Sequence, residues 1–186
     1  MCLYIGLLHY PVYNKNYQII TSAITNFDLH DISRVARTYG VKRFFIITPL
    51  SDQQRLADAI RAHWTTGYGA RYNRYRKEAV ELTAVISSLD ASLREIAEIE
   101  GKRPVLITTD ALRHKKECIS YPEAIRIINS GRPVMLLFGT AWGLDKTIIE
   151  RSDFLIEPIE GCTGYNHLSV RTAAAIILDR LMGREK

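Results

Sequence analysis

The chain alternates short apolar runs with amphipathic segments along most of its length, and this alternation limits the folds open to it. The apolar runs contain mostly Val, Ile, Leu and Phe and lack the polar alternation of a half-exposed strand. They lie at 3–8, 43–49, 79–88, 103–110, 132–139 and 153–158. We predict strands buried on both faces, and therefore an α/β fold with a mainly parallel sheet and helices on both faces.

The segments between these runs carry signals for the starts and ends of helices. We predict helices at 27–40, 51–64, 92–101 and 120–131, a surface helix at 145–152, and an alanine-rich helix after residue 166. Asp28 is the predicted N-cap of the first helix, and Gly40 and Gly101 end two of them. Two capping boxes are predicted, Ser51 with Gln54 and Ser120 with Glu123.

Length and composition predict one domain over residues 1–186, since 186 residues contain no internal repeat or low-complexity tract. No apolar stretch is long enough to span a bilayer, and the N-terminus lacks a signal-peptide pattern, so we expect a cytoplasmic protein without a membrane partner. The three cysteines form no CxxC pair, and the five histidines have no metal-ligand spacing. Neither a disulfide framework nor a metal site is expected.

Ligands of parallel sheets bind where the strands end, and polar or glycine-containing ends occur in the C-terminal half of this chain. No Walker phosphate loop and no complete dinucleotide fingerprint is present. Glycines in the loop after residue 138 allow close approach of backbone groups to a flat ligand, although a plain strand-to-helix turn explains them as well. The candidate residues at the strand ends and in this loop are Thr108, Thr109, Phe138, Gly139, Thr140, Gly143, Leu144, Ile156 and Pro158.

A second candidate segment runs from Ile159 into the alanine-rich helix. Gly161 and Gly164 punctuate the turn, and Asn166 is well placed to cap the helix, with His167 and Ser169 in its first turn. Alanines such as Ala173 leave room for a ligand beside the helix. Together with Leu168 and Ile159 as apolar walls, these residues predict a ligand cradle with the helix as its floor.

A basic stretch at 59–77 contains five Lys or Arg and no Asp or Glu, in a chain of net charge +5. Tyr68, Tyr72 and Tyr75 are interleaved with these cations. Arginine and aromatic residues on a loop suit RNA contact, and the alternative is a solvated loop whose tyrosines fold onto the core. A second basic patch is predicted at Arg113, His114, Lys115 and Lys116.

Three segments together resemble the SPOUT superfamily of S-adenosylmethionine-dependent RNA methyltransferases. "NFDLHDISRVARTYGVKRFFII" is similar to the first motif of that superfamily, "LLFGTAWGL" to the second and "YNHLSVRTAAAIIL" to the third. The likeness is to a small stand-alone branch akin to the tRNA guanine-N1 methyltransferase C-terminal domain family. The second motif has Thr-Ala-Trp where ribose-methylating relatives have a glutamate.

The resemblance implies a C-terminal trefoil knot, a homodimer that shares the alanine-rich helix, and S-adenosylmethionine held by the loops at 138–144 and 156–168. It implies methyl transfer to tRNA or rRNA, with the basic stretch beside the entrance. Arg34 occupies the place of the first motif's arginine, and His30 or Asp31 could accept a proton. A helix-surface role for Arg34, a capping role for His30 and Asp31, and a non-catalytic S-adenosylmethionine- or RNA-binding protein on the same fold remain alternatives, as does an unrelated α/β nucleotide-binding protein.

Overall fold

A computed structural model describes residues 2–112 and 116–184. Its helices and strands follow one another along the chain much as the apolar runs predict. The strands are β1 (Leu3–Leu8), β2 (Val12–Tyr13), β3 (Ile19–Ile20), β4 (Arg43–Ile47), β5 (Thr83–Ile86), β6 (Val105–Thr108), β7 (Cys118–Ile119), β8 (Val134–Gly139) and β9 (Phe154–Ile156). The helices are α1 (Asn26–Thr38), α2 (Ser51–Thr65), α3 (Tyr68–Tyr72), α4 (Arg74–Val80), α5 (Leu89–Glu100), α6 (Tyr121–Ile128), α7 (Lys146–Arg151) and α8 (Val170–Met182).

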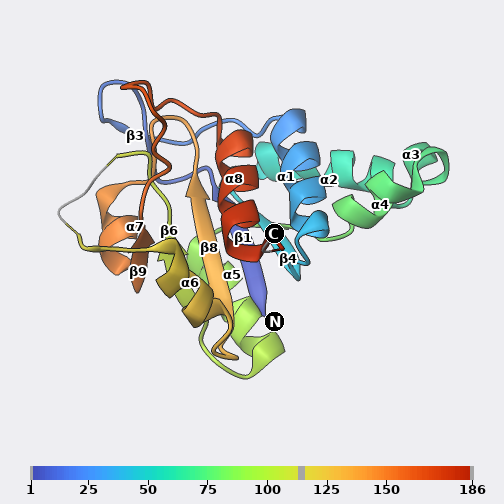
Figure 1. The fold of residues 1–186 in the computed structure, drawn as a ribbon. Helices are drawn as coiled ribbons and strands as arrows, with labels where there is room; N and C mark the ends of the chain where they lie inside the picture. The colour runs from blue at the N-terminus through green and yellow to red at the C-terminus, as the bar shows by residue number, and fades with distance from the viewer. Residues whose placement is uncertain (1, 113–115, 185–186) are drawn as a thin grey trace.

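Seven of the strands form one sheet in the order β5-β4-β1-β8-β6-β9-β7. Every neighbouring pair is parallel, and β1 and β8 pair along their whole lengths at its centre. Figure 1 shows α1 and α8 side by side across these central strands. The predicted α/β class with a mainly parallel sheet is confirmed.

Both faces of the sheet are buried, which explains why its strands are continuously apolar. Alternate residues such as Ile5 and Leu136 pack with side chains of α1, α6 and α8 on one face. Their neighbours, such as Tyr4 and Leu137, pack with α5 and α7 on the other. Because side chains of a strand alternate between faces, one apolar run supplies both cores.

Some of the predicted helix caps are confirmed, and others are wrong. Ser120 and Glu123 form the predicted capping box at the start of α6, and Gly101 ends α5 with φ of 68°. The N-cap of α1 is Thr25 and not Asp28, because the Thr25 side chain accepts the Asp28 amide hydrogen. Ser51 is the first residue of α2 and caps nothing, since the N-cap, Leu50, offers no side-chain acceptor.

The antiparallel hairpin of β2 and β3 follows β1 and was not predicted. The Tyr13 amide donates to the Gly143 carbonyl at 3.0 Å, and the Trp142 amide donates to the Tyr13 carbonyl at 3.0 Å. These bonds hold the hairpin against the loop that follows β8, so segments more than a hundred residues apart in the chain meet at the carboxyl edge of the sheet.

The basic stretch at 59–77 is helical, and the expectation of a loop is wrong. It contains the end of α2, all of α3 and the first turn of α4. We call α3 and α4 the arm, because Figure 1 shows them projecting away from the sheet beyond α1. Among the described residues, no helix is both long and apolar enough to cross a bilayer.

Candidate functional site

A cavity of about 780 Å³ opens at the carboxyl edge of the sheet. Four segments form it, namely the hairpin region after β1, the loop after β6, the loop after β8, and the loop that leads into α8. These segments converge because the carboxyl ends of parallel strands lie at one edge. The size is that of a cavity for a small-molecule ligand or cofactor.

Most of the predicted ligand-binding residues line this cavity together. They are Thr109, Phe138, Gly139, Thr140, Gly143, Ile159, Asn166, His167, Leu168, Ser169 and Ala173. Four others are directed into the protein and do not line it. Thr108 bonds the Ser152 hydroxyl at 2.9 Å, and Leu144, Ile156 and Pro158 are buried.

Two glycines, Gly139 at the end of β8 and Gly143 in the loop that follows, are not easily replaced by another residue. A Cβ on Gly139 would lie 2.9 Å from the Leu144 amide nitrogen, and Gly143 has φ of 101° with Asp110 Oδ2 3.3 Å from the place of its Cβ. Packing against Leu144 and the positive φ of Gly143 therefore account for these two glycines within the protein itself. At Gly161 and Gly164 a Cβ would meet open space, so close packing of the protein does not account for those glycines.

The start of α8 differs from the prediction in its cap. Ser169 is the N-cap, and its hydroxyl accepts the Thr172 amide hydrogen. Asn166 lies outside the helix, and its Nδ2 donates to the Ala111 carbonyl at 2.8 Å. The asparagine therefore ties the loop before α8 to the loop after β6, across the cavity.

Sequence reasoning missed the contribution of the hairpin region and did not single out several residues in or beside the predicted loops. These are Tyr17, Ser22, Ala23, Thr25, Asp28, Asp110, Ala111, Leu112, Ala141, Trp142, Val170 and Ile177. Asp110 was visible as the polar residue after a strand, but no local signal places residues 17–25 at the carboxyl edge. Tyr17 and Ala141 have positive φ of 58° and 53°, a conformation that non-glycine residues adopt rarely and that clusters at functional sites.

Among the described residues, the charged side chains that line the cavity include two carboxylates. The carboxylates of Asp28 and Asp110 are in its lining, whereas no Lys or Arg is, within the described part of the chain. Asp28 accepts from the Thr25 hydroxyl at 2.6 Å and from Arg171 Nη1 at 3.0 Å.

A buried histidine lies behind the cavity wall. His9 Nδ1 lies 2.9 Å from the Ser22 hydroxyl, which lies 2.5 Å from the Thr140 hydroxyl, and both hydroxyl residues line the cavity. Burial lowers the pKa of His9 to about 4, although the charge of Asp28 acts in the opposite direction. The imidazole is therefore neutral near pH 7, and its Nε2 has no hydrogen-bond partner among the described residues.

The predicted catalytic residues lie beside the cavity and not in it. Asp31 and Arg34 line a groove of about 610 Å³ between α1 and α8, which Ser169 and Arg171 also line. Arg171 Nε lies 3.5 Å from Asp31 Oδ2, so this arginine joins the groove to Asp28 in the cavity. The structure does not bring His30 to the groove. Its ring packs edge-on against Trp64 at 5.3 Å, and its pKa is lowered by burial and by the charge of Arg76.

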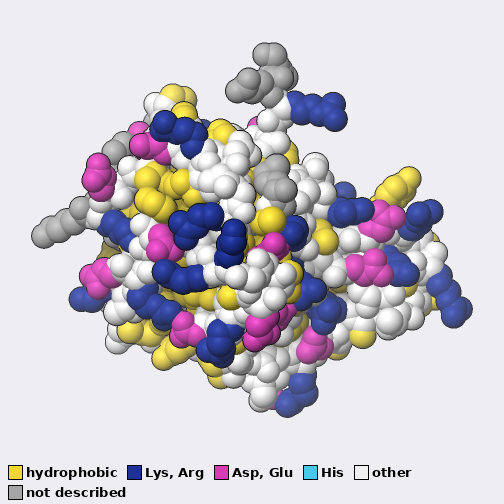
Figure 2. All heavy atoms as spheres, turned by 90° about the horizontal axis from the view of Figure 1, so that it is seen from below, with side chains coloured by type: hydrophobic (Ala, Val, Ile, Leu, Met, Phe, Trp, Pro, Cys, Tyr) yellow, Lys and Arg dark blue, Asp and Glu magenta, His cyan; other side chains and the backbone are white. Residues whose placement is uncertain are grey.

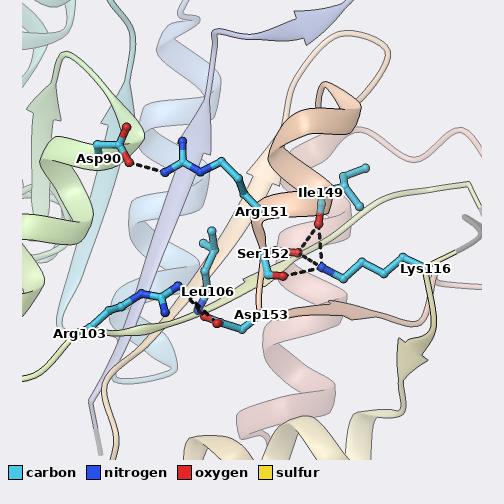
Figure 3. Close-up of polar contacts among 8 residues, drawn as sticks. All are labelled: Asp90, Arg103, Leu106, Lys116, Ile149, Arg151, Ser152 and Asp153. Atoms are coloured by element: carbon cyan, nitrogen blue, oxygen red, sulfur yellow. Dashed lines mark hydrogen bonds and ion pairs between the residues drawn. The ribbon is translucent and has the colours of Figure 1, made fainter.

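The basic stretch at 59–77 does not line the cavity, and three of the four residues of the second predicted patch lie outside the described residues. No residue of 59–77 lines the cavity or the groove. Arg113, His114 and Lys115 lie outside the described residues. Lys116 donates from Nζ to the Ile149 carbonyl at 2.8 Å and to the Ser152 hydroxyl at 2.9 Å, as Figure 3 shows. Its ammonium stabilises the C-terminal end of α7 and is engaged there.

A parallel sheet with a cavity at its carboxyl edge, lined by glycine-containing loops, is the arrangement of an α/β protein that binds a small cofactor. This chain belongs to the SAM-dependent RNA methyltransferase family, which matches residues 2–183. The resemblance drawn from the three motifs is thereby confirmed.

Individual relatives and solved structures are similar to this chain. A tRNA (guanine-N(1)-)-methyltransferase of Oleidesulfovibrio alaskensis is 42% identical over 97% of this chain, and the chain spans only 42% of that protein. An uncharacterized protein of Aquifex aeolicus is 35% identical, over 99% of this chain and 90% of its own length. The SpoU methyltransferase AviRb of Streptomyces viridochromogenes, solved with AdoMet, shares the fold with a TM-score of 0.56 at 16% identity, over 98% of this chain and 56% of its own.

Proposed function

We propose that this protein transfers a methyl group from S-adenosylmethionine to a nucleotide of structured RNA, either tRNA or rRNA. Family membership supports the reaction. The cavity at the carboxyl edge of the sheet is the observation that supports the location of the site. The chain is proposed to act as one domain, in the cytoplasm, as a homodimer and without a metal ion.

The residues of the cavity fit S-adenosylmethionine. Ile159 and Leu168 supply apolar walls for an adenine ring, and Gly139 and Gly143 leave backbone groups accessible beside it. The ligand carries a sulfonium and an ammonium, and the carboxylates of Asp28 and Asp110 in the lining are groups that attract such a cation.

S-adenosylmethionine supplies a methyl group bonded to a positively charged sulfur, and departure of the neutral thioether needs no acid. The remaining tasks for the protein are to align the acceptor and to remove its proton. Arg34 is exposed in the groove and forms no ion pair with a described residue, so its guanidinium is free to bind an RNA phosphate. Asp31, next to it, is the candidate proton acceptor, whereas His30 supports α1 through Trp64.

The trefoil knot and the dimer are part of the same proposal. The hydrogen bond from Asn166 to Ala111 places the loop before α8 against the loop after β6, which is consistent with a chain that passes back through its own fold. Ala175 and Ile176 on α8 are incompletely covered in the single chain, so a second copy has small apolar side chains to pack against.

A non-catalytic protein that binds S-adenosylmethionine or RNA is the second candidate. The loop after β8 places Ala141 and Trp142 in the cavity lining and has no glutamate of its own there. Such a protein would bind the cofactor and RNA without turnover.

Labelled-methyl transfer to total RNA from a strain that lacks the protein tests the proposal, followed by mapping of the modified nucleotide. We expect label in one RNA class, and calorimetric heat with S-adenosylmethionine. Heat without label would favour the second candidate. The absence of both heat and label would refute both candidates.

The matched variants are Ala173→Leu and Ala59→Leu. Ala173 lines the cavity, so a leucine would fill part of it while keeping a good helix former, whereas Ala59 is exposed on α2. We expect Ala173→Leu to abolish the heat of cofactor binding and Ala59→Leu to leave it unchanged.

A further inference from the structure

We propose that the arm is a docking surface for an unpaired stretch of RNA, whose bases stack on its exposed tyrosines. The proposal rests on the proposed function only for the choice of RNA as partner. The surface itself is separate from both the cavity and the groove, since no arm residue lines either of them.

Aromatic rings are exposed on the arm to an extent that folding does not explain. Tyr68, Tyr72 and Tyr75 are 73%, 75% and 84% exposed, so the alternative in which they fold onto the core is wrong. Tyr68 and Tyr72 stack on each other, with ring centroids 6.2 Å apart and an interplanar angle of 20°. Stacked rings with free outer surfaces are what proteins offer to the faces of unpaired bases.

The arm is held rigidly although its tyrosines are exposed. The Arg76 guanidinium lies over the Trp64 ring at 4.4 Å, and a Cβ on Gly69 would approach that ring to 2.6 Å. The Asn73 side chain accepts the Arg76 amide hydrogen at 2.9 Å and caps α4. A platform fixed before binding loses less conformational entropy when the RNA arrives.

Positive charge accompanies the rings. Figure 2 shows Lys and Arg side chains at the outer end of the molecule where the arm projects. Arg71 is exposed and has no ion pair with a described residue, and Arg74 has an exposed pair with Glu78 at 3.1 Å. An exposed pair of this kind contributes little, so Arg74 can exchange it for a phosphate.

These features favour unpaired RNA over a duplex. The bases of an RNA duplex are stacked on one another, and proteins bind it through phosphates and 2′-hydroxyls, for which exposed tyrosine faces are not needed. Unpaired loop bases can be accommodated on the rings while the arginines bind the backbone. The arm would then hold the RNA at a distance from the nucleotide that is modified.

The experiment measures fluorescence anisotropy of labelled oligoribonucleotides, single-stranded and duplex, with wild type and with Tyr68→Ala/Tyr72→Ala. We expect affinity for the single strand to fall at least about tenfold in the double variant. Tyr68→Phe/Tyr72→Phe should restore it because the rings remain. Ile99→Ala is the control, since it removes an exposed apolar side chain from α5.

Further readouts separate this proposal from the proposed function. If the enzyme is active, the alanine pair should raise KM for RNA with little change in kcat and no change in the heat of S-adenosylmethionine binding. A second outcome is that the wild-type protein transfers no methyl group while the alanine pair still lowers affinity for the single strand. That result would support the docking surface and refute the activity. Three results with the alanine pair would overturn the docking surface. They are an unchanged affinity for the single strand, an equal loss of affinity for the duplex, and a loss of self-association without a loss of RNA affinity.

Discussion

His9 shows how burial determines the charge of one side chain behind the cavity. Its ring is fully buried between the strand ends and the hairpin, and its pKa is held at about 4. The neutral ring is linked through Ser22 to Thr140, so the packing that neutralises His9 also fixes two hydroxyls at the cavity wall.

We predict that this histidine makes the protein less stable in mild acid. The unfolded chain binds a proton on His9 below about pH 6.5 and the native protein does not, so stability rises with pH between 4 and 6.5. The contribution, complete above pH 6.5 and lost as pH falls toward 4, is about 3 kcal/mol. Denaturant titrations should show a flatter dependence for His9→Asn, which retains an amide near Ser22 but does not titrate. Identical slopes in the two proteins would contradict this.

Arg34 and Arg37 allow a test of the RNA groove with two arginines of one helix. Arg34 lines the groove, whereas Arg37 Nη2 lies 3.7 Å from Glu78 Oε2 on α4, away from the groove. We predict that Arg34→Ala lowers kcat/KM for methyl transfer by about a hundredfold, because a charge that positions the acceptor is lost. Arg37→Ala should have little effect, and calorimetry should give wild-type cofactor affinity for both. Equal losses in both variants would show that the groove is not the acceptor site.

Helix starts illustrate what spacing along the chain can and cannot predict. The sequence pattern at Ser51 and Gln54 matches that at Ser120 and Glu123, yet only the second pair forms a capping box. Gln54 Nε2 instead donates to the Thr48 carbonyl at 2.8 Å. The two sites differ by one residue in where the helix begins. Helix α2 begins at Ser51 itself, whereas α6 begins one residue after Ser120.

This difference predicts unequal effects of the same substitution. Ser120→Ala should lower the free energy of unfolding by about 1 kcal/mol, since the hydroxyl accepts the Glu123 amide hydrogen. Ser51→Ala should change it by less than about 0.5 kcal/mol, because that exposed hydroxyl caps no helix. Urea denaturation of both variants measures the comparison. A larger effect at Ser51 would mean that α2 begins one residue later in solution.

The strands of the main sheet other than β7 were predicted because a parallel strand buried on both faces needs a continuously apolar run. The two-residue strand β7 (Cys118–Ile119) was not predicted. The arm was not, since its helices are short and obtain their stability from packing Gly69 and Arg76 on Trp64 rather than from a long apolar periodicity. The hairpin at 12–20 was missed for a related reason. Its backbone bonds go to residues 142 and 143, which no local pattern reveals.

The parallel sheet determines which residues of the cavity could be predicted from the sequence. Residues on the loops after β6 and β8 and before α8 were found because they follow apolar runs and contain glycine or polar residues. Thr108 and Thr109 show the limit of that argument. They are adjacent, but only Thr109 faces the cavity, while Thr108 bonds Ser152 beneath it. Which of two neighbours faces a ligand depends on the register of the sheet.

Assembly is the remaining property of the protein that the single chain allows us to predict. On α8, Ala174, Ile177 and Leu178 are buried, while Ala175 and Ile176 are incompletely covered. An apolar face left uncovered on α8 offers the same helix of a second copy a surface to pack against, and a two-fold dimer uses the same patch on both copies. We expect sedimentation to give twice the chain mass of 21.2 kDa.

Ala175→Arg tests the contact directly, because the two introduced guanidinium groups, one on each copy, would repel each other across the two-fold axis. We expect this variant to sediment as a single chain of 21.2 kDa with its circular dichroism spectrum unchanged, and the exposed Ala59→Arg to remain dimeric. Since Ala175 also lines the groove that contains Arg34, methyl transfer should fall in the monomeric variant while cofactor heat persists. A wild-type protein that sediments as one chain at micromolar concentration would rule out the dimer, and a dimeric Ala175→Arg would place its interface elsewhere.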